Sequence, residues 1–301
     1  MINKIIYENE RDISIELNRE GPLFLFKPEG FDGLEADTVS SKSAYQDGIS
    51  ISKTILKDRI LTLNCYLEIE NEQQRYILKR KLYNAFNPKL KGHMKIYTDA
   101  GNLRGASNLR VIQAPIFDDD YETTNELVSF QIQLAMPLPY FEDINENRAD
   151  FGNDIGNFFF DLEIEEEGKE LSIKNNSIVT NIFNEGHSET PLKVVFKAKS
   201  NVKNPSIYNV YTKEFIKINK EMQPGEEITV TTSIGNKRVE SYFNGITTNI
   251  FNNLDIHSTF MWLDVGDNII RYDAEEMLEQ LEVYIHYTNY IWVCSIWNYM
   301  Y

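Results

Sequence analysis

The sequence predicts a mainly β protein of two domains with a single α-helix. In several segments apolar residues recur at every second position, which is the period of a strand with one buried face. Another segment has the spacing of an amphipathic helix. The length of 301 residues is about twice that of a typical domain, so we expect two separate cores.

The first half is predicted to consist mainly of strands that form an N-terminal β-sandwich. Its alternating apolar positions are Ile13, Ile15 and Leu17, then Leu61, Leu63, Cys65, Leu67 and Ile69, and later Val128, Phe130, Ile132, Leu134 and Met136. Successive side chains of a strand point to opposite faces, so each of these strands has one buried face and one wet face.

The helix is predicted over residues 71–87. Asn71 belongs to the residue types that cap helix N-termini, and Pro88 ends the helix. Between them Leu78, Leu82, Ala85 and Phe86 form an apolar stripe at i, i+4, i+7 and i+8. Such a helix is about 25 Å long at 1.5 Å per residue. Because it lies among antiparallel strands, we expect it to cross one face of the sheet structure.

A domain boundary is predicted near residue 145, which gives domains 1–145 and 146–301. Two prolines, Pro137 and Pro139, end the last strand of the first half, and the polar residues 142–147 follow. Strand-like runs then return at residues 158–164, 191–198, 207–210, 215–218, 227–232, 269–272 and 281–287. Turn signals such as Gln223-Pro224-Gly225 separate them, as is typical of a second, helix-poor β-sandwich.

Composition and charge limit the classes of function. The two cysteines, Cys65 and Cys294, are predicted to be free thiols. The formal charge of −16 opposes binding to nucleic acid phosphates and anionic membranes. The N-terminus lacks the features of a signal peptide, and no apolar run is long enough to span a membrane, so we expect synthesis and assembly in a cytoplasm.

Motifs for catalysis, cofactors or metals are not found, and we predict no catalytic, cofactor-binding or metal-binding residue. None of the 15 glycines forms a phosphate-binding loop. The segment Gly105-Ala106-Ser107-Asn108-Leu109 lacks the second glycine of a serine hydrolase elbow and is interpreted as a loop. His93, His187, His257 and His286 have no paired spacing. Asp118-Asp119-Asp120 lacks the other residues of a calcium loop and is interpreted as an exposed hairpin tip.

Exposed aromatic residues in the second half are candidates for stacking on sugar rings. They are Trp262, Tyr242 and Phe243. Alternation within strands favours the other interpretation, that these rings face a core. The 46 acidic residues neither support nor exclude a glycosidase, since no carboxylate pair stands out.

Short ordered features resemble the family of phage distal tail proteins over about nine tenths of the chain. In the first half they are Pro28-Glu29-Gly30-Phe31-Asp32-Gly33, the strand of residues 61–69 followed by the capped helix, and the segment of residues 134–141. In the second half they are Asn184-Glu185-Gly186 leading to Pro191, Asn204-Pro205, Asn209, residues 228–230 and 237–239, Leu263, residues 266–272 and 283–287, Tyr290 and Val293. The aromatic-rich residues 294–301 extend beyond the usual family pattern, and their role is open between an edge strand, a partner contact and a frayed tail.

The resemblance implies a structural role in the tail tip of a phage with a long non-contractile tail. It implies that the second domain is a galectin-like β-sandwich and that the first domains form a homohexameric hub ring. The implied partners are the tail tube protein on one face of the ring, a tail-associated fibre or lysin protein on the other, and a receptor-binding protein. The ring would assemble in the host bacterial cytoplasm and become part of the virion, with no membrane contact and no enzymatic activity.

DNA is expected to pass through the axis of such a ring without specific binding. The surplus of acidic side chains allows a neutral to acidic channel wall, and residues 118–122 are the candidate wall residues. Two other functions stay open. A carbohydrate-binding adhesion module would require an aromatic ring beside converging polar side chains, and a cell-wall hydrolase would require paired carboxylates whose pKa values differ.

Overall fold

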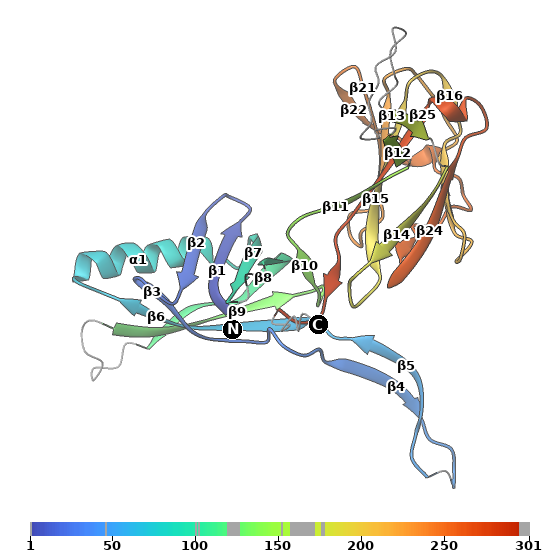
Figure 1. Ribbon diagram of the computed structural model, residues 1–301. Coiled ribbons are helices and arrows are strands. Elements are labelled where there is room, and N and C mark those ends of the chain that lie inside the picture. Colours follow the sequence, from blue (N-terminus) through green and yellow to red (C-terminus); the bar gives the residue numbers. More distant parts are fainter. Residues whose placement is uncertain are drawn as a thin grey trace, which may run out of the picture. The chain divides into compact units, whose positions relative to one another are not determined.

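The computed structural model describes residues 2–45, 47–99, 101, 103–118, 127–151, 153–156, 172–175 and 178–294 (Figure 1). These residues form two units with separate cores. The first comprises the residues through Ile144 together with those from Tyr290 on, and the second comprises Asn145–Asn289. Within these residues the fold is mainly β with one α-helix, as predicted.

The first unit is built on a large sheet that closes on itself. Its strands follow the order β26-β10-β8-β7-β1-β2-β3-β6-β9, and β8 also pairs with β9. The strands are β1 (Ile2–Asn9), β2 (Ser14–Asn18), β3 (Leu23–Glu29), β6 (Arg59–Glu68), β7 (Lys91–Thr98), β8 (Leu103–Asp118), β9 (Leu127–Met136), β10 (Phe141–Asp143) and β26 (Tyr290–Ile291). Between β3 and β6 the chain forms a separate ribbon of β4 (Ala36–Ser41) and β5 (Ser50–Leu56).

The alternating apolar residues of the first half line the inside of this closed sheet. Buried side chains occupy every second position of β6 and β9, and the two strands pair antiparallel in a continuous register from Arg59 opposite Met136 to Glu68 opposite Leu127. The predicted face of β6, Leu61 to Ile69, is buried throughout. The strand predictions for this half are therefore confirmed.

The predicted helix is also confirmed, as α1 (Glu72–Ala85). The Asn71 side chain accepts a hydrogen bond from the backbone N–H of Gln74, which caps the first turn. Leu82, Ala85 and Phe86 are buried, and the helix lies against β1, β2 and β8. At the other end the buried Asn9 side chain donates hydrogen bonds to the carbonyls of Asn84 and Ala85. These bonds satisfy carbonyls that the last helical turn leaves without a partner.

Two stacked aromatic rings fix the C-terminal end of α1 on the closed sheet, which forms a barrel. Tyr7 is fully buried and stacks on Phe86 with ring centroids 4.4 Å apart. Burial raises the pKa of the Tyr7 hydroxyl to about 12. Position 92 must be glycine, because a Cβ there would stand 2.2 Å from the Tyr7 hydroxyl oxygen.

The second unit is a sandwich of two main sheets, in agreement with the prediction. One sheet has the order β11-β25-β15-β20-β21-β22, with β23 beside β15, and the other has the order β14-β24-β17-β18. Their strands are β11 (Asn147–Asp150), β14 (Val179–Asn184), β15 (Thr190–Ala198), β17 (Ser206–Asn209), β18 (Phe215–Lys217), β20 (Glu227–Thr231), β21 (Arg238–Phe243), β22 (Ile246–Asn249), β23 (Trp262–Leu263), β24 (Gly266–Asp273) and β25 (Leu281–Tyr287). Buried side chains from both sheets form one core.

Smaller elements complete this unit. They are the strand pairs β12 (Asn153–Gly156) with β13 (Ser172–Asn175) and β16 (Val202–Lys203) with β19 (Glu221–Met222), and the short 3-10 helices η1 (Phe251–Asn253) and η2 (Leu278–Gln280). The predicted strand at residues 158–164 lies outside the described residues. Within the described part of the chain, no helix is long and apolar enough to cross a membrane.

One boundary requires correction. The second domain was expected to extend to residue 301, but the chain returns to the first unit at Tyr290. There β26 pairs antiparallel with β10, Tyr290 stacks on Tyr140 at a centroid distance of 5.0 Å, and Cys294 is buried in the first core. The chain returns because the apolar side chains of Tyr290, Ile291 and Cys294 are buried in the first unit. Residues 295–301 lie outside the described part.

Candidate assembly surface

The ribbon formed by β4 and β5 projects from the first unit (Figure 1). Among the described strands, β4 and β5 pair only with each other. Every side chain of the ribbon is exposed except that of Leu56, which is half-buried. Val39, Ile51 and Ile55 are each about half exposed, at 52%, 57% and 48%. A two-stranded ribbon is marginally stable in water, and both of its edges offer unpaired backbone groups. Its form suits contact with another molecule.

Ion pairs hold the base of the ribbon. The Lys57 Nζ lies 3.1 Å from an Asp37 carboxylate oxygen and 3.8 Å from one of Glu35. The hydrogen bond with Asp37 raises the pKa of Lys57, so this side chain stays charged. Because the pair is exposed, we assign it a role in orientation and not in stability.

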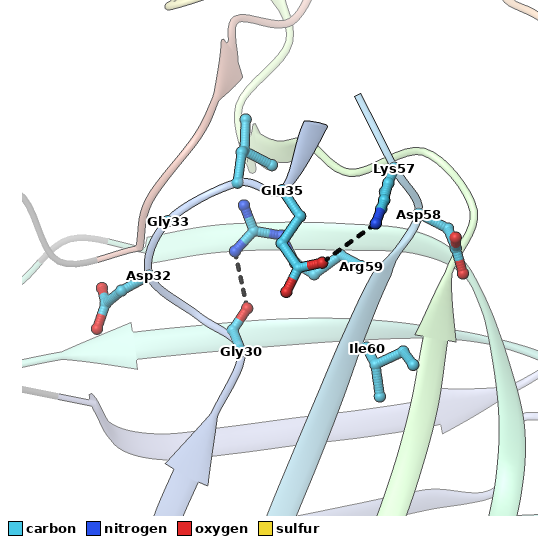
Figure 2. A pocket seen from close by; sticks show the side chains of 9 residues that line it. Gly30, Asp32, Gly33, Glu35, Lys57, Asp58, Arg59 and Ile60 are labelled. Carbon is cyan, nitrogen blue, oxygen red and sulfur yellow. Dashed lines mark hydrogen bonds and ion pairs between the residues drawn. The ribbon is translucent and has the colours of Figure 1, made fainter. Parts of the chain in front are cut away.

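A hollow of about 310 Å³ lies beside these residues, and Figure 2 shows it from close by. Its lining comes from two stretches that meet at the base of the ribbon, residues 30–35 and residues 57–60. Gly30 has a positive φ of 85°, and a Cβ there would stand 2.1 Å from the Ile60 carbonyl oxygen. Only glycine allows the two backbones to approach so closely.

Arg59 is buried at this place and joins three segments. Its guanidinium donates hydrogen bonds to the carbonyl oxygens of Gly30 at 2.7 Å, Trp292 at 2.6 Å and Pro139 at 3.3 Å. The guanidinium also lies 4.7 Å from the centroid of the Phe141 ring. The side chain is only 5% exposed, and burial lowers its pKa from the usual arginine value. Arg59 therefore connects the start of the ribbon to β10 and to the C-terminal segment.

The buried thiol of Cys294 lies in the same segment. The backbone N–H of Cys294 donates a hydrogen bond to the carbonyl oxygen of Phe31. Burial raises the pKa of this thiol far above the ordinary value, and burial raises that of Cys65 to about 12. Both cysteines are free, as predicted, and both are protected as neutral thiols.

The segment from Gly105 to Leu109 was interpreted as a loop, and this is wrong. It lies inside β8, where the left-handed Asn108, with φ 55°, allows a register shift opposite Gly92 and Met94. Ser107 donates a hydrogen bond of 2.8 Å to Glu142. Burial raises the pKa of Glu142 although this hydrogen bond opposes the shift.

The histidines lie in separate places. His93 is near Glu8, and His286 contacts Glu146 at 3.0 Å. Within the described residues, no group of three or more histidine, cysteine or acidic side chains is arranged to hold a metal ion. Asp118 ends β8, whereas residues 119–122 of the predicted channel wall lie outside the described part.

Another buried carboxylate belongs to the second unit. Glu226 is bound by the Lys220 ammonium at 2.5 Å, by the Gln223 backbone N–H at 3.0 Å and by the Ser241 hydroxyl. Burial disfavours its charge, but these hydrogen bonds together outweigh burial and lower its pKa. Glu142 belongs to the first unit and Glu226 to the second.

The aromatic candidates differ in their exposure. Tyr242 is 51% exposed on β21, so the prediction that it faces a core is wrong. Trp262 and Phe243 are half-buried, and the Trp262 indole N–H donates to the carbonyl of Thr232 at 3.3 Å. In the register of the sheet, Glu227 and Thr247 flank Tyr242 on the two neighbouring strands.

Arg59 and the ribbon were not predicted as functional features. A signal for Arg59 was present, because it stands two residues before Leu61 and so has the phase of the buried face of β6. An arginine at a position of the buried face is expected to be buried, and a buried guanidinium requires several hydrogen-bond acceptors around it. In the ribbon, Lys53 separates Ile51 from Ile55, so no continuous apolar alternation marks its strands in the sequence.

Two family models match the chain, one over each unit. The phage tail protein RIFT-related domain matches residues 13–136, and the C-terminal domain of the Siphovirus-type tail component matches residues 185–290. A search of curated proteins gave no significant match.

Solved structures share the fold over nearly the whole chain. The SPP1 Dit protein, described as a paradigm of the hub adsorption apparatus in phages that infect Gram-positive bacteria, aligns with a TM-score of 0.67 at 11% identity, covering 95% of this chain and 98% of that one. A chain of the phage P2 baseplate in its activated conformation with Ca aligns with a TM-score of 0.58 at 10% identity, covering 97% and 99%. The corresponding baseplate with Sr gives 0.55 at 11% identity, covering 95% and 98%.

Proposed function

We propose that this chain, a member of the siphophage distal tail protein family, is a hub component of the phage tail and forms a homohexameric ring at the tail tip. The first units build the ring, and the second units are the galectin-like domains attached to it. The role is mechanical and requires no catalysis. The tail tube protein would bind one face of the ring, and a fibre or lysin protein would bind the other.

The observation that supports this proposal most directly is the exposed β4–β5 ribbon. An unpaired ribbon with half-exposed Val39, Ile51 and Ile55 gains stability when a neighbouring subunit covers it. In a ring with cyclic symmetry one heterologous contact repeats until the ring closes, and it leaves an axial hole. The net charge of −16 favours passage of DNA through that hole without retention.

Reconstruction of the virion tests the ring. We expect a six-fold layer of this protein at the tail tip, and its absence from that place would contradict the proposal. The ribbon is tested by Ile51→Ser with Ile55→Ser, which should reduce incorporation into tails because the apolar contact is lost. Thr54→Ser on the same strand is the matched control and should assemble normally. Equal incorporation of all variants would exclude the ribbon as the ring contact.

Carbohydrate binding by the second unit is the second candidate function. It is favoured by Tyr242, whose exposed ring stands between Glu227 and Thr247 on an open sheet face. A glycan array with the full chain tests it. We expect binding that Tyr242→Ser abolishes, and an array without a signal would remove this candidate.

A further inference from the structure

The helix α1 has a second stripe on the side that points away from the core. Leu82 and Ala85 are buried against the sheet. Tyr76, Arg80 and Tyr83 follow one another at i, i+4 and i+7, which places them together on the opposite side. Tyr76 is 65% exposed and Tyr83 is 49% exposed. Ile77, beside this stripe, is 55% exposed. We call these four residues the outer face of α1.

The residue types of the outer face differ from those of an ordinary solvated helix. A helix surface that meets only water carries mainly charged and polar side chains. Tyrosine and arginine are instead the types that dominate the centres of protein interfaces. The Tyr83 ring is also held in place, because it forms a T-shaped pair with the Phe117 ring at a centroid distance of 5.7 Å. The Lys79 ammonium lies 4.4 Å from the centroid of the same Phe117 ring.

The charge around the outer face is opposite to that of the rest of the chain. The helix, residues 72–85, contains four basic side chains and one acidic side chain, whereas the remaining residues contain 26 basic and 45 acidic ones. Arg75 is paired with Glu72. Arg80 and Lys81 have no ion pair among the described residues. The helix therefore forms a cationic region on an acidic protein, and the complementary charge is available on another copy of the same protein.

We propose that the outer face of α1 is a docking surface for a second copy of this chain. Carboxylates of that copy would pair with Arg80 and Lys81 while its apolar atoms cover Tyr76 and Tyr83. The inference rests on the ring proposed above and names a contact within it. Two basic helices would repel each other, so the contact joins different patches of the two copies. A head-to-tail contact of this kind is what a closed ring requires.

The test measures assembly of the full chain by sedimentation velocity over a range of protein concentrations, at low and high salt. We expect the wild type to associate and the association to weaken with salt. Arg80→Glu and, separately, Tyr76→Ser should raise the dissociation constant about tenfold or more, since central tyrosine and arginine residues carry most interface energy. Both positions are exposed, so the melting temperature should not change.

Lys213→Glu is the matched control, because it makes the same change of charge at an exposed site in the second unit. A wild type that remains monomeric at all concentrations would overturn the inference. So would unchanged association in both helix variants, or an equal effect of Lys213→Glu. Binding of duplex DNA that Arg80→Glu removes, without any effect on association, would assign the face to nucleic acid instead. In each of these cases a six-fold layer in the virion would still support the proposed function.

Discussion

Replacement of Arg59 by methionine should release the C-terminal segment from the first unit. The substitution removes three hydrogen bonds from a charged donor, each of which contributes about 1.5–3 kcal/mol. Two of the acceptor carbonyls are only partly buried and can be rehydrated, and the loss of a buried cation returns its desolvation cost. We therefore expect a net destabilisation of about 3 kcal/mol, which lowers the melting temperature by about 6–12 °C in a unit of this size.

The thiol of Cys294 reports on this release. In the wild type, burial and a raised pKa should keep it unreactive towards a thiol reagent under native conditions. In Arg59→Met it should react, while Cys65 inside the barrel stays protected and serves as the internal reference. Arg59→Lys keeps the positive charge but cannot donate to all three carbonyls in the same geometry. Its melting temperature and the reactivity of its Cys294 should therefore lie between those of the wild type and Arg59→Met. If Arg59→Met leaves both the melting temperature and the protection of Cys294 unchanged, the guanidinium does not hold the segment.

Three further predictions concern the core, a close backbone approach and a hydrogen-bonded carboxylate. Leu82→Ala should cost about 2–5 kcal/mol, because its side chain is fully buried, whereas Ile77→Ala on the exposed side should leave thermal unfolding nearly unchanged. Gly30→Ala should lower the melting temperature more than Gly33→Ala, since both have positive φ but only at position 30 would the Cβ meet a backbone oxygen; equal effects would contradict the close approach. The lowered pKa of Glu226 means that its stabilisation is complete above the ordinary glutamate pKa of about 4.3 and is lost as the pH falls through the folded value. Acid titrations of stability should therefore be flatter in Glu226→Gln than in the wild type, and superimposable curves would refute the assignment.

The sequence allowed prediction of the elements that repeat a regular period. The strand from Leu61 to Ile69 and the helix capped by Asn71 were predicted because alternation and helical spacing follow directly from which face is buried. The segment around Ser107 was misinterpreted as a loop, because glycine and asparagine are typical of turns. In this protein Asn108 instead produces a bulge inside a long strand, and tertiary pairing outweighs the local preference.

The assembly surface was harder to predict, for a physical reason. A ribbon that no part of its own subunit covers has no buried face, so β4 and β5 show no continuous apolar alternation. Likewise, the outer face of α1 could not be separated from ordinary helix surface by spacing alone. It can be identified only after the structure shows that the side of α1 with Leu82 is buried, because the opposite side then carries the exposed Tyr76 and Tyr83.

The pairing of β10 with β26 gives the protein an insertion topology. Phe141 faces Ile291 and Glu142 faces Tyr290 in an antiparallel pair, so the entire second unit takes the place of a hairpin loop between two adjacent strands. Replacing that unit with a short turn would leave an ordinary hairpin on the first unit. A stop codon just before Tyr290, by contrast, would preserve the second unit and remove a strand from the first. The sequence of the second unit can therefore vary while the first unit stays constant. The C-terminal strand β26, in contrast, must be retained because it belongs to the first unit.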